Sequence, residues 1–505
     1  MNGQPRPGPL ALTIDQTFVI PREFSVAVAR LRDMQIESSL QGWAREEVES
    51  MVVRDRRHAS RAALMLVRMW ERPAARVLDV FSTSAERQGA YDFLENSAIS
   101  AQSLSASIGE ATVMRARDDG ELLAVVDGSS LTITDIQQTK DFGAIGDAQF
   151  KARGLKLVHA YGVSVDGVPV GLLAQTWWTR IKKKKTREHR CRKLSEKETV
   201  RWVDTIEASS AVVKRLEVPM RLCFVMDREA DNANVLQTLD QSGHDFIVRS
   251  CHDRRLVSPD DQREYLRETL ANTKPRGHYK LQVKGAPDRQ AREARMAVRY
   301  RKVTLRVRDS ATDKCWHQTV NVVSTIEVDT TPEGEKPLSW ILLTNRAVRS
   351  FKAACTVIQR YAYRWRIEDL HRTWKSGVCG VESNQLRKSA HVIKWATLMA
   401  ATAARIERLK MLARSTPEQP ASAEFTKYEI MAAIFERRRT KKRTDPEPTD
   451  TPTIGEIVRW MADIGGYTGK SSGGPPGSIT IARGFERIAP NAKLLEFLER
   501  EGKLR

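Results

Sequence analysis

Two short apolar runs, each followed by an aspartate, constrain the fold of this chain most strongly. The run ELLAVV precedes Asp127, and the run RLCFVM precedes Asp227. Such runs predict buried strands, and the stretch from Leu194 to Arg215 between them has helical periodicity. In an α/β sheet, ligands bind beyond the carboxyl ends of the strands. We therefore predict an α/β fold in which both carboxylates converge on one site, although a lone aspartate at a strand end is often a turn former or a helix cap.

The segments around these strands extend the α/β pattern. LKLVHAYGVSV and VPVGLLAQTWW flank Asp166 and Gly167, a two-residue turn of the kind that β-hairpins favour. After Asp227, the helical stretch READNANVLQTLDQ leads to a strand, DFIVRS. From Cys251 to about Ser339, apolar and polar residues alternate, which predicts a β-rich insertion. PLSWILLTN then returns to the core.

The run QRYAYRWRIEDLHRTWKSG predicts a helix with one chemically distinctive stripe. The stripe consists of Tyr361, Arg364, Glu368 and Lys375, with Arg372 and Trp365 on the same side. At about 100° per residue, the first four fall within roughly 60° of arc. Cations and an aromatic ring around one carboxylate suit a phosphodiester whose metal is held by that carboxylate. The alternative is an amphipathic helix with solvated i,i+4 pairs, such as Arg364 with Glu368.

Three carboxylates from distant segments suit two-metal phosphodiester chemistry. Two Mg²⁺ ions about 4 Å apart activate the attacking oxygen and stabilise the leaving one. Mg²⁺ binds through few carboxylates, and water and phosphate complete its shell. Asp127, Asp227 and Glu368 are the candidate ligands for such a site. The expected cofactor is a pair of Mg²⁺ ions, for which Mn²⁺ can substitute.

These motifs together resemble the IS-four family of DDE transposases, of the Tn-five type. The match rests on the YREK spacing of the stripe and on the motif DREAD at residues 227–231, and it covers roughly residues 40 to 500. The resemblance implies a ribonuclease-H-like core and cut-and-paste transposition, with Asp127, Asp227 and Glu368 as the catalytic and metal-binding residues. The transposon end would be nicked, the freed 3′ hydroxyl would form a hairpin, water would open it, and the 3′ end would join target DNA. Val126, Gly128 and Ser129 replace the family's acidic and threonine residues around Asp127.

The resemblance also implies which residues bind DNA. Those expected to hold end phosphates are Tyr361, Arg364, Lys375 and Arg249, with Arg372 beside them. Trp340 would stack a base flipped out during hairpin formation, and Trp365 would lie near that base. Stacking is worth roughly 1–3 kcal/mol per base, which offsets much of the unstacking cost. Packing in the core is the alternative for both tryptophans.

A helical N-terminal segment resembles the family's DNA-binding domain. The pattern runs from Trp43 to about Gly109, and Arg56, Arg57 and Arg61 lie on consecutive turns before the apolar run AALMLVRMW. Such arginines can clamp backbone phosphates. The resemblance places Arg57 and Arg61 where the family contacts the transposon end, and a solvated helix face is the alternative.

The C-terminal segment resembles the family's dimerisation domain, which pairs two transposases across two DNA ends, so a homodimer in a paired-end complex is expected. Thr480 and Ile481 replace bulkier residues there.

The sequence patterns and the resemblance together divide the chain into six parts. The predicted divisions are a loose extension at 1–38, a helical DNA-end-binding domain at 39–118, the first part of the core at 119–250, the β-rich insertion at 251–338, the second part of the core at 339–414 and the dimerisation domain at 415–505.

Composition agrees with DNA as the partner. The chain of 505 residues has 83 Lys and Arg against 63 Asp and Glu, a net charge of +20, which favours a polyanion. Basic runs at residues 181–193 and 436–443 are either DNA contacts or solvated loops. The most apolar stretch, from Trp395 to Ala404, is too short to cross a bilayer. With no leader sequence, a cytoplasmic, nucleoid-associated bacterial protein is expected.

Other cofactors and functions are weaker alternatives. Six cysteines without CxxC spacing indicate neither a zinc site nor a disulfide framework. GYTGKSSGG lacks the spacing and the preceding strand of a P-loop, so no nucleotide cofactor is expected. A metal-dependent nuclease without strand transfer would keep the three carboxylates. A domesticated DNA-binding regulator would bind DNA without cutting it, and the presence of all three carboxylates argues against it.

Overall fold

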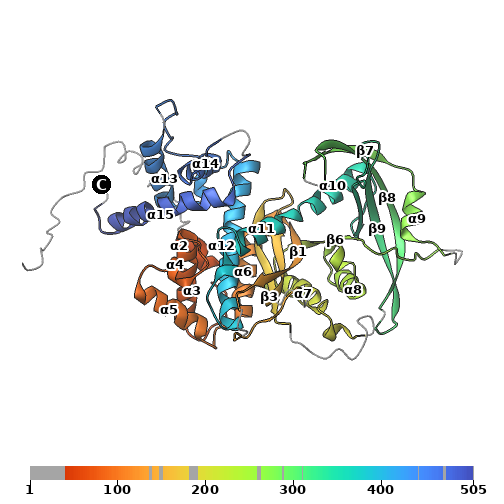
Figure 1. The fold of residues 1–505 in the computed structure, drawn as a ribbon, viewed down its shortest axis with the longest axis horizontal. Helices are drawn as coiled ribbons and strands as arrows, with labels where there is room; N and C mark the ends of the chain where they lie inside the picture. Colours follow the sequence, from red (N-terminus) through yellow and green to blue (C-terminus); the bar gives the residue numbers. More distant parts are fainter. Residues whose placement is uncertain are drawn as a thin grey trace, which may run out of the picture.

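The structure is a computed structural model. It describes residues 40–135, 139–146, 152–180, 192–258, 263–286, 289–309, 311–441, 443–469 and 474–503. The predicted extension at 1–38 and most of the first basic run, at 181–191, lie outside the described residues. The chain has the predicted α/β architecture. Helices from both ends of the sequence gather at one end of a central sheet, and β7 to β9 (green) lie at the other (Figure 1).

Within the described residues, one mixed sheet of ten strands has the order β2-β3-β1-β5-β6-β10-β9-β8-β7, with β4 beside β3. The strands are β1 (Glu121–Thr132), β2 (Gly143–Ala144), β3 (Arg153–Val163), β4 (Pro169–Trp178), β5 (Arg221–Met226), β6 (Asp245–Arg249), β7 (Gly277–Val283), β8 (Arg292–Arg308), β9 (Cys315–Glu327) and β10 (Ser339–Thr344). Strands β1, β5 and β6 are parallel. The predicted hairpin joins β3 to β4.

The β-rich segment continues the core sheet. Strand β10 pairs with β6 on one side and with β9 on the other, so β7 to β9 extend the same hydrogen-bonded ladder. In β8, Val303, Leu305 and Val307 are buried while Arg306 is exposed, which is the alternation of a strand with one packed face. A short helix, α9 (Leu266–Ala271), precedes β7.

Helices cover both faces of the sheet around β1. Leu123 and Val125 point into one apolar cluster, and Ala124 and Val126 point into another on the opposite face. A strand buried on both faces reads as a continuous apolar run, which explains ELLAVV. The covering helices are α6 (Ala101–Arg115), α7 (Val200–Leu216), α8 (Ala233–Gln241), α10 (Phe351–Ala362), α11 (Trp365–Lys375) and α12 (Ser389–Ser415).

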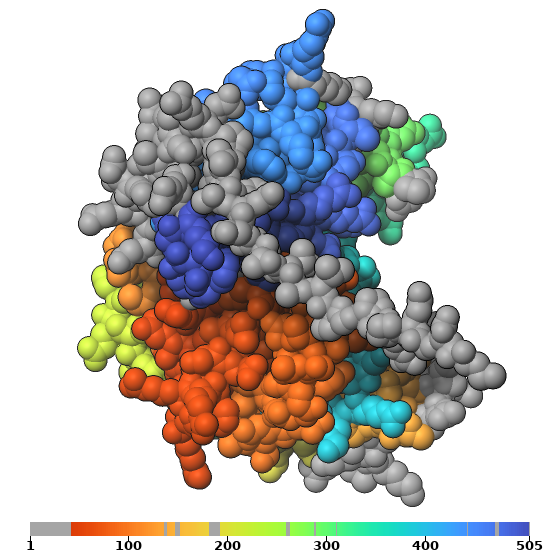
Figure 2. All heavy atoms as spheres, turned by 90° about the vertical axis from the view of Figure 1, so that its left-hand side faces the viewer, coloured from red at the N-terminus to blue at the C-terminus, as the bar shows by residue number. Residues whose placement is uncertain are grey.

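The N-terminal and C-terminal helices pack against each other and against α12. They are α2 (Leu40–Glu46), α3 (Arg56–Glu71), α4 (Val77–Val80) and α5 (Ser84–Glu95), and α13 (Lys427–Thr440), α14 (Ile454–Ile464) and α15 (Ser478–Arg500). Trp70 of α3 and Phe485 of α15 have ring centroids 4.5 Å apart. Figure 2 shows the C-terminal helices (blue) against the N-terminal ones (red and orange). None of the helices in the described part of the chain has the length and hydropathy of a membrane span.

Candidate active site

Asp127 lies where the two neighbours of β1 diverge. The parallel pairing with β5 ends at Val126 and Met226, and the next residues on the two strands are Asp127 and Asp227. Because the strands are adjacent and parallel, the two aspartates come next in the same register and lie side by side at the carboxyl end of this strand pair. The prediction that the strand ends at Asp127 was wrong, because antiparallel pairing with β3 carries β1 on to Thr132.

Both aspartates also accept local backbone hydrogen bonds. Asp227 caps a short 3-10 turn, and its Oδ1 accepts the N–H of Glu229 at 2.8 Å. Oδ1 of Asp127 accepts the N–H of Gly128 at 2.9 Å. One oxygen of each carboxylate is thereby fixed. The sequence left open whether these aspartates cap turns or converge on one site. Asp227 does both, because it caps a turn and lies beside Asp127.

The predicted single helix is two helices joined by a bend. Helix α10 ends at Ala362 and α11 begins at Trp365. The amides of Arg364 and Ile367 bond to carbonyls three residues earlier, at 3.0 and 3.1 Å, which is the tighter 3-10 pattern. The β3–β4 turn lies against this bend. Nε of Arg366 donates to the carbonyl of Gly167 at 2.9 Å.

Arg364 bridges two of the predicted catalytic carboxylates. Its Nη1 lies 3.2 Å from Oδ2 of Asp127, and its Nη2 lies 2.6 Å from Oε1 of Glu368. The guanidinium is mostly buried, whereas the Glu368 side chain is more open to solvent. The bend thus brings the carboxylate of α11 to the same cation as the carboxylate of β1.

The charge on Asp127 is disfavoured by its surroundings. Burial is the largest cause, and together with the charge of Asp227 it raises the pKa of Asp127 to about 7, while Arg364 opposes the rise. The electrostatic influence of Asp227 agrees with the parallel register of β1 and β5, which places the two aspartates next to each other. A buried carboxyl with a perturbed pKa beside other carboxylates is typical of a functional site. It suits a group that ionises when a cation binds.

A second cluster joins Tyr361, Arg249 and Trp340. The Tyr361 side chain is buried and hydrogen-bonded to Arg249, and burial raises the pKa of its phenol, with a further small rise from the charge of Asp227. Trp340 of β10 lies edge-on to Tyr361, with ring centroids 5.2 Å apart, and it is partly buried. These three predicted DNA-binding residues therefore border the carboxylates. Trp340 combines core packing with partial exposure.

The remaining residues of the stripe are more peripheral. Trp365 is 57% exposed, and the Arg364 guanidinium carbon lies 5.3 Å from its ring centroid. Arg372 is exposed and paired with Asp369. Nζ of Lys375 lies 3.8 Å from Glu382, near the far end of β1. The bend and these pairings separate the stripe into an inner part around Arg364 and an outer part toward Lys375.

The predicted N-terminal arginines lie on α3, outside this cluster. Arg57 is exposed and pairs at 2.7 Å with Asp55, the N-cap of α3. Arg61 is half-buried over Gly89 of α5, where an added Cβ would lie 2.6 Å from its Nη1. In the described part of the second basic run, four cations have acidic partners in the same chain: Arg437 with Asp445, Arg438 with Asp450, Arg439 with Glu436 and Lys441 with Glu447.

The last residue of DREAD has a structural role that the motif did not predict. Asp231, Cys251 and His252 have potential ligand atoms within 4.8 Å of one another. However, Oδ1 of Asp231 is bonded to Arg254, and its Oδ2 accepts the amides of Cys251 and His252 at 2.8 and 3.0 Å. Because these donors occupy both oxygens, Asp231 anchors the segment after β6. Helix α8 and strand β6 separate Asp231 from these partners in the sequence, so the spacing of the residues did not predict the hydrogen bonds.

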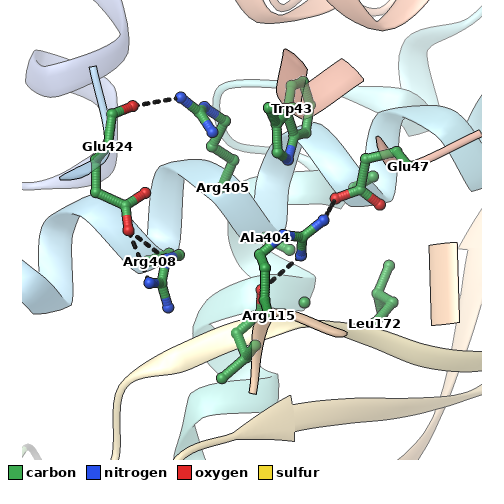
Figure 3. A pocket seen from close by; sticks show the side chains of 11 residues that line it. Trp43, Glu47, Arg115, Leu172, Ala404, Arg405, Arg408 and Glu424 are labelled. Carbon is green, nitrogen blue, oxygen red and sulfur yellow. Dashed lines mark hydrogen bonds and ion pairs between the residues drawn. The ribbon is translucent and has the colours of Figure 1, made fainter. Parts of the chain in front are cut away.

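A small polar cavity lies away from this site, between α2, α6 and α12 (Figure 3). Glu47, Arg115 and Arg405 line it, and each has a buried side-chain atom without a hydrogen bond. Its volume of about 20 Å³ suffices for one water molecule. It is therefore too small to be a substrate site.

Comparisons with protein families agree with the geometry. Residues 40–99 match the family described as transposase DNA-binding, and residues 178–404 match the family described as transposase DDE domain. The second match includes Asp227 and Glu368 and begins after Asp127. It confirms the predicted ribonuclease-H-like α/β core. The chain thus carries both a transposase DNA-binding domain and a transposase DDE domain, the domain pair of a DDE-type DNA transposase.

Proposed function

We propose that the protein is a cut-and-paste transposase of the IS-four type, which cleaves transposon ends through a DNA hairpin and transfers the 3′ ends to target DNA. The observation that carries the proposal is the bridge from Asp127 through Arg364 to Glu368, with Asp227 acting electrostatically on the same site. Carboxylates on β1, directly after β5 and on α11 thereby belong to one region. The raised pKa of Asp127 favours a functional role for this region.

The donor set fits Mg²⁺. Asp127, Asp227 and Glu368 offer hard carboxylate oxygens, which Mg²⁺ prefers in small number. When bound, two such ions would activate the attacking oxygen and stabilise the leaving one. Arg364 pairs with two of the carboxylates and offsets part of their negative charge, so it keeps these two acids together before DNA arrives. Glu368, the more exposed of the two, remains accessible from solvent.

The residues around the carboxylates are proposed to hold DNA. Tyr361 lies within the electrostatic range of Asp227 and is hydrogen-bonded to Arg249, and Lys375 extends the cationic stripe outward. Exposed Trp365 offers a face for stacking on a base. Trp340 is proposed to take the flipped base, and Arg372, Arg57 and Arg61 to contact phosphates. The six divisions predicted from the sequence are part of the same proposal, with the C-terminal segment forming a homodimer.

Substitution of the three acids tests the catalytic assignment. Asp127→Asn, Asp227→Asn and Glu368→Gln should each abolish Mg²⁺-dependent cleavage of an end duplex while gel-shift binding persists, because metal coordination needs ionised oxygens. Asp369→Asn is the matched control, since Asp369 adjoins Glu368 but pairs with Arg372, and it should cleave normally. If one of these three variants cleaves at the wild-type rate, the substituted residue does not belong to the catalytic site. Joining of ends to target DNA distinguishes a transposase from a simple nuclease.

A further inference from the structure

Two buried histidines connect α11, which carries Glu368, to β3, the antiparallel neighbour of the strand that carries Asp127. His159 of β3 is 0% exposed and His371 of α11 is 8% exposed. Nδ1 of His159 lies 3.1 Å from Nε2 of His371. A buried polar pair is costly unless it is hydrogen-bonded, so this contact specifies where the helix lies on the sheet.

Each histidine is a close neighbour of one carboxylate. His159 is the direct cross-strand partner of Asp127, and side chains at such positions share a face with Cβ atoms about 4.5–5.5 Å apart. His371 follows Glu368 by three residues, so the two lie on the same side of α11. The histidine contact therefore runs alongside the bridge that Arg364 makes between the two carboxylates.

The surrounding hydrogen bonds fix the direction of this contact. Nε2 of His159 lies 3.2 Å from Oε1 of Gln175, and an amide oxygen only accepts, so this nitrogen carries the proton. The Gln175 amide is oriented because its Nε2 donates to the carbonyl of Thr397 at 3.4 Å. Nδ1 of His159 is then the acceptor, and His371 donates from Nε2. One ordered chain of donors runs from α11 through β3 and β4 to α12.

Aromatic packing holds both rings in place. The His159 ring centroid lies 5.1 Å from that of Trp374 and 6.4 Å from that of Trp177. Burial lowers the pKa of His159 to about 4 and that of His371 well below its usual value. Both rings are therefore neutral at physiological pH, as the single chain of donors requires.

We propose that His159 and His371 are positioning residues, which hold Glu368 at the correct distance from Asp127 for metal binding. This inference rests on the proposed function, because it takes the two carboxylates as metal ligands. Without the directional contact, α11 could slide or rotate on the apolar surface of β1 and β3. The two carboxylates would then meet a metal ion less favourably, although the fold would remain.

The test is Mn²⁺ binding to the DNA-free, full-length protein, measured by electron paramagnetic resonance, together with thermal melting. His371→Phe keeps an aromatic ring of similar size but removes the donor, and it should weaken Mn²⁺ affinity roughly 3- to 10-fold, the range expected for one lost hydrogen bond. His371→Gln restores an N–H donor and should recover part of the affinity. It also serves if the phenylalanine variant fails to fold.

Thr373→Val is the matched control. Thr373 is buried on the same helix, but its hydroxyl donates to Glu407 of α12 at 2.5 Å, away from the carboxylates. This variant should lower the melting temperature and leave Mn²⁺ affinity unchanged. Wild-type affinity in His371→Phe, or an equal loss in Thr373→Val, would overturn the proposal. Glu368→Gln distinguishes failure of the proposed function from failure of the positioning role. If Glu368→Gln still binds Mn²⁺ normally, the proposed function fails. If Glu368→Gln loses Mn²⁺ binding but His371→Phe does not, only the positioning role fails.

Discussion

Among single residues, Asp127 links the stability of the protein most directly to its proposed chemistry. Burial raises its pKa from the usual 3.8 to about 7. A raised pKa in the folded state means that the group's contribution to stability is present below about pH 4 and is lost as the pH rises to 7. At neutral pH and above, the metal-free fold therefore bears the cost of a buried charge. Metal binding relieves that cost.

Asp127→Asn should accordingly stabilise the metal-free protein. In EDTA at pH 8, the variant should melt at a higher temperature than the wild type, and the difference should shrink as the pH falls from 7 toward 4. Adding Mg²⁺ should raise the melting temperature of the wild type more than that of the variant, because only the wild type keeps the full ligand set. Calorimetry across this pH range measures both effects. An equal difference at pH 4 and pH 8 would contradict the burial argument.

Two tryptophans on α11 separate DNA contact from packing. Trp365 is 57% exposed and Trp374 is 0% exposed, so Trp365→Ala should change stability by no more than about 0.5 kcal/mol. If Trp365 stacks on a base, this variant should lose roughly 1–3 kcal/mol of DNA-binding free energy, or the barrier to hairpin formation should rise by the same amount. Trp374→Ala is the control and should cost about 3–5 kcal/mol of stability. Unchanged DNA binding and hairpin formation in Trp365→Ala would leave the exposed ring without its proposed role.

At the scale of elements, local patterns predicted the strands and helices but not where two of them end. The apolar run before Asp127 predicted β1, yet β1 continues to Thr132 because β3 pairs along its whole length. The helical stripe was recognised from its period, yet the helix bends near Arg364, where the β3–β4 turn packs. Both errors occur at places where a segment distant in sequence contacts the element. Local periodicity carries no information about such a contact.

In the candidate site, too, local patterns were predictable and contacts between distant segments were not. The three carboxylates and the cations of the stripe were predicted from their residue types, their spacing and the resemblance to the transposase family, and the structure brings Asp127 and Glu368 to one cation, Arg364. The contact of His159 with His371 joins residues 212 apart in sequence, and Asp231 meets its partner Arg254 only because β6 and the following loop return to it. Each of these residues is unremarkable in its own segment. Buried hydrogen bonds between distant segments therefore had to come from the structure.

For the whole molecule, the two helical ends form one continuous core with α12. Residues of α3, α12, α14 and α15 belong to the same apolar cluster, and Lys493 of α15 pairs with Glu71 of α3. Deleting the C-terminal segment would uncover the ring of Trp70 where Phe485 packs on it. A truncation would thus damage the N-terminal helices as well as any dimer contact. Assembly is better tested on the solvent-exposed surface of α15.

Leu494 and Phe497 of α15 are 52% and 45% exposed, and large apolar side chains in solvent are common at protein–protein contacts. If the C-terminal segment pairs two transposases, Leu494→Asp combined with Phe497→Asp should abolish paired-end complexes in native gels. Binding to a single end and the melting temperature should persist, because neither side chain is in the core. Arg483→Gln gives the charge change of one such substitution at an exposed position of the same helix without removing apolar surface, and it should assemble normally. Paired-end complexes formed by the double variant at wild-type concentrations would place the dimer contact elsewhere on the molecule.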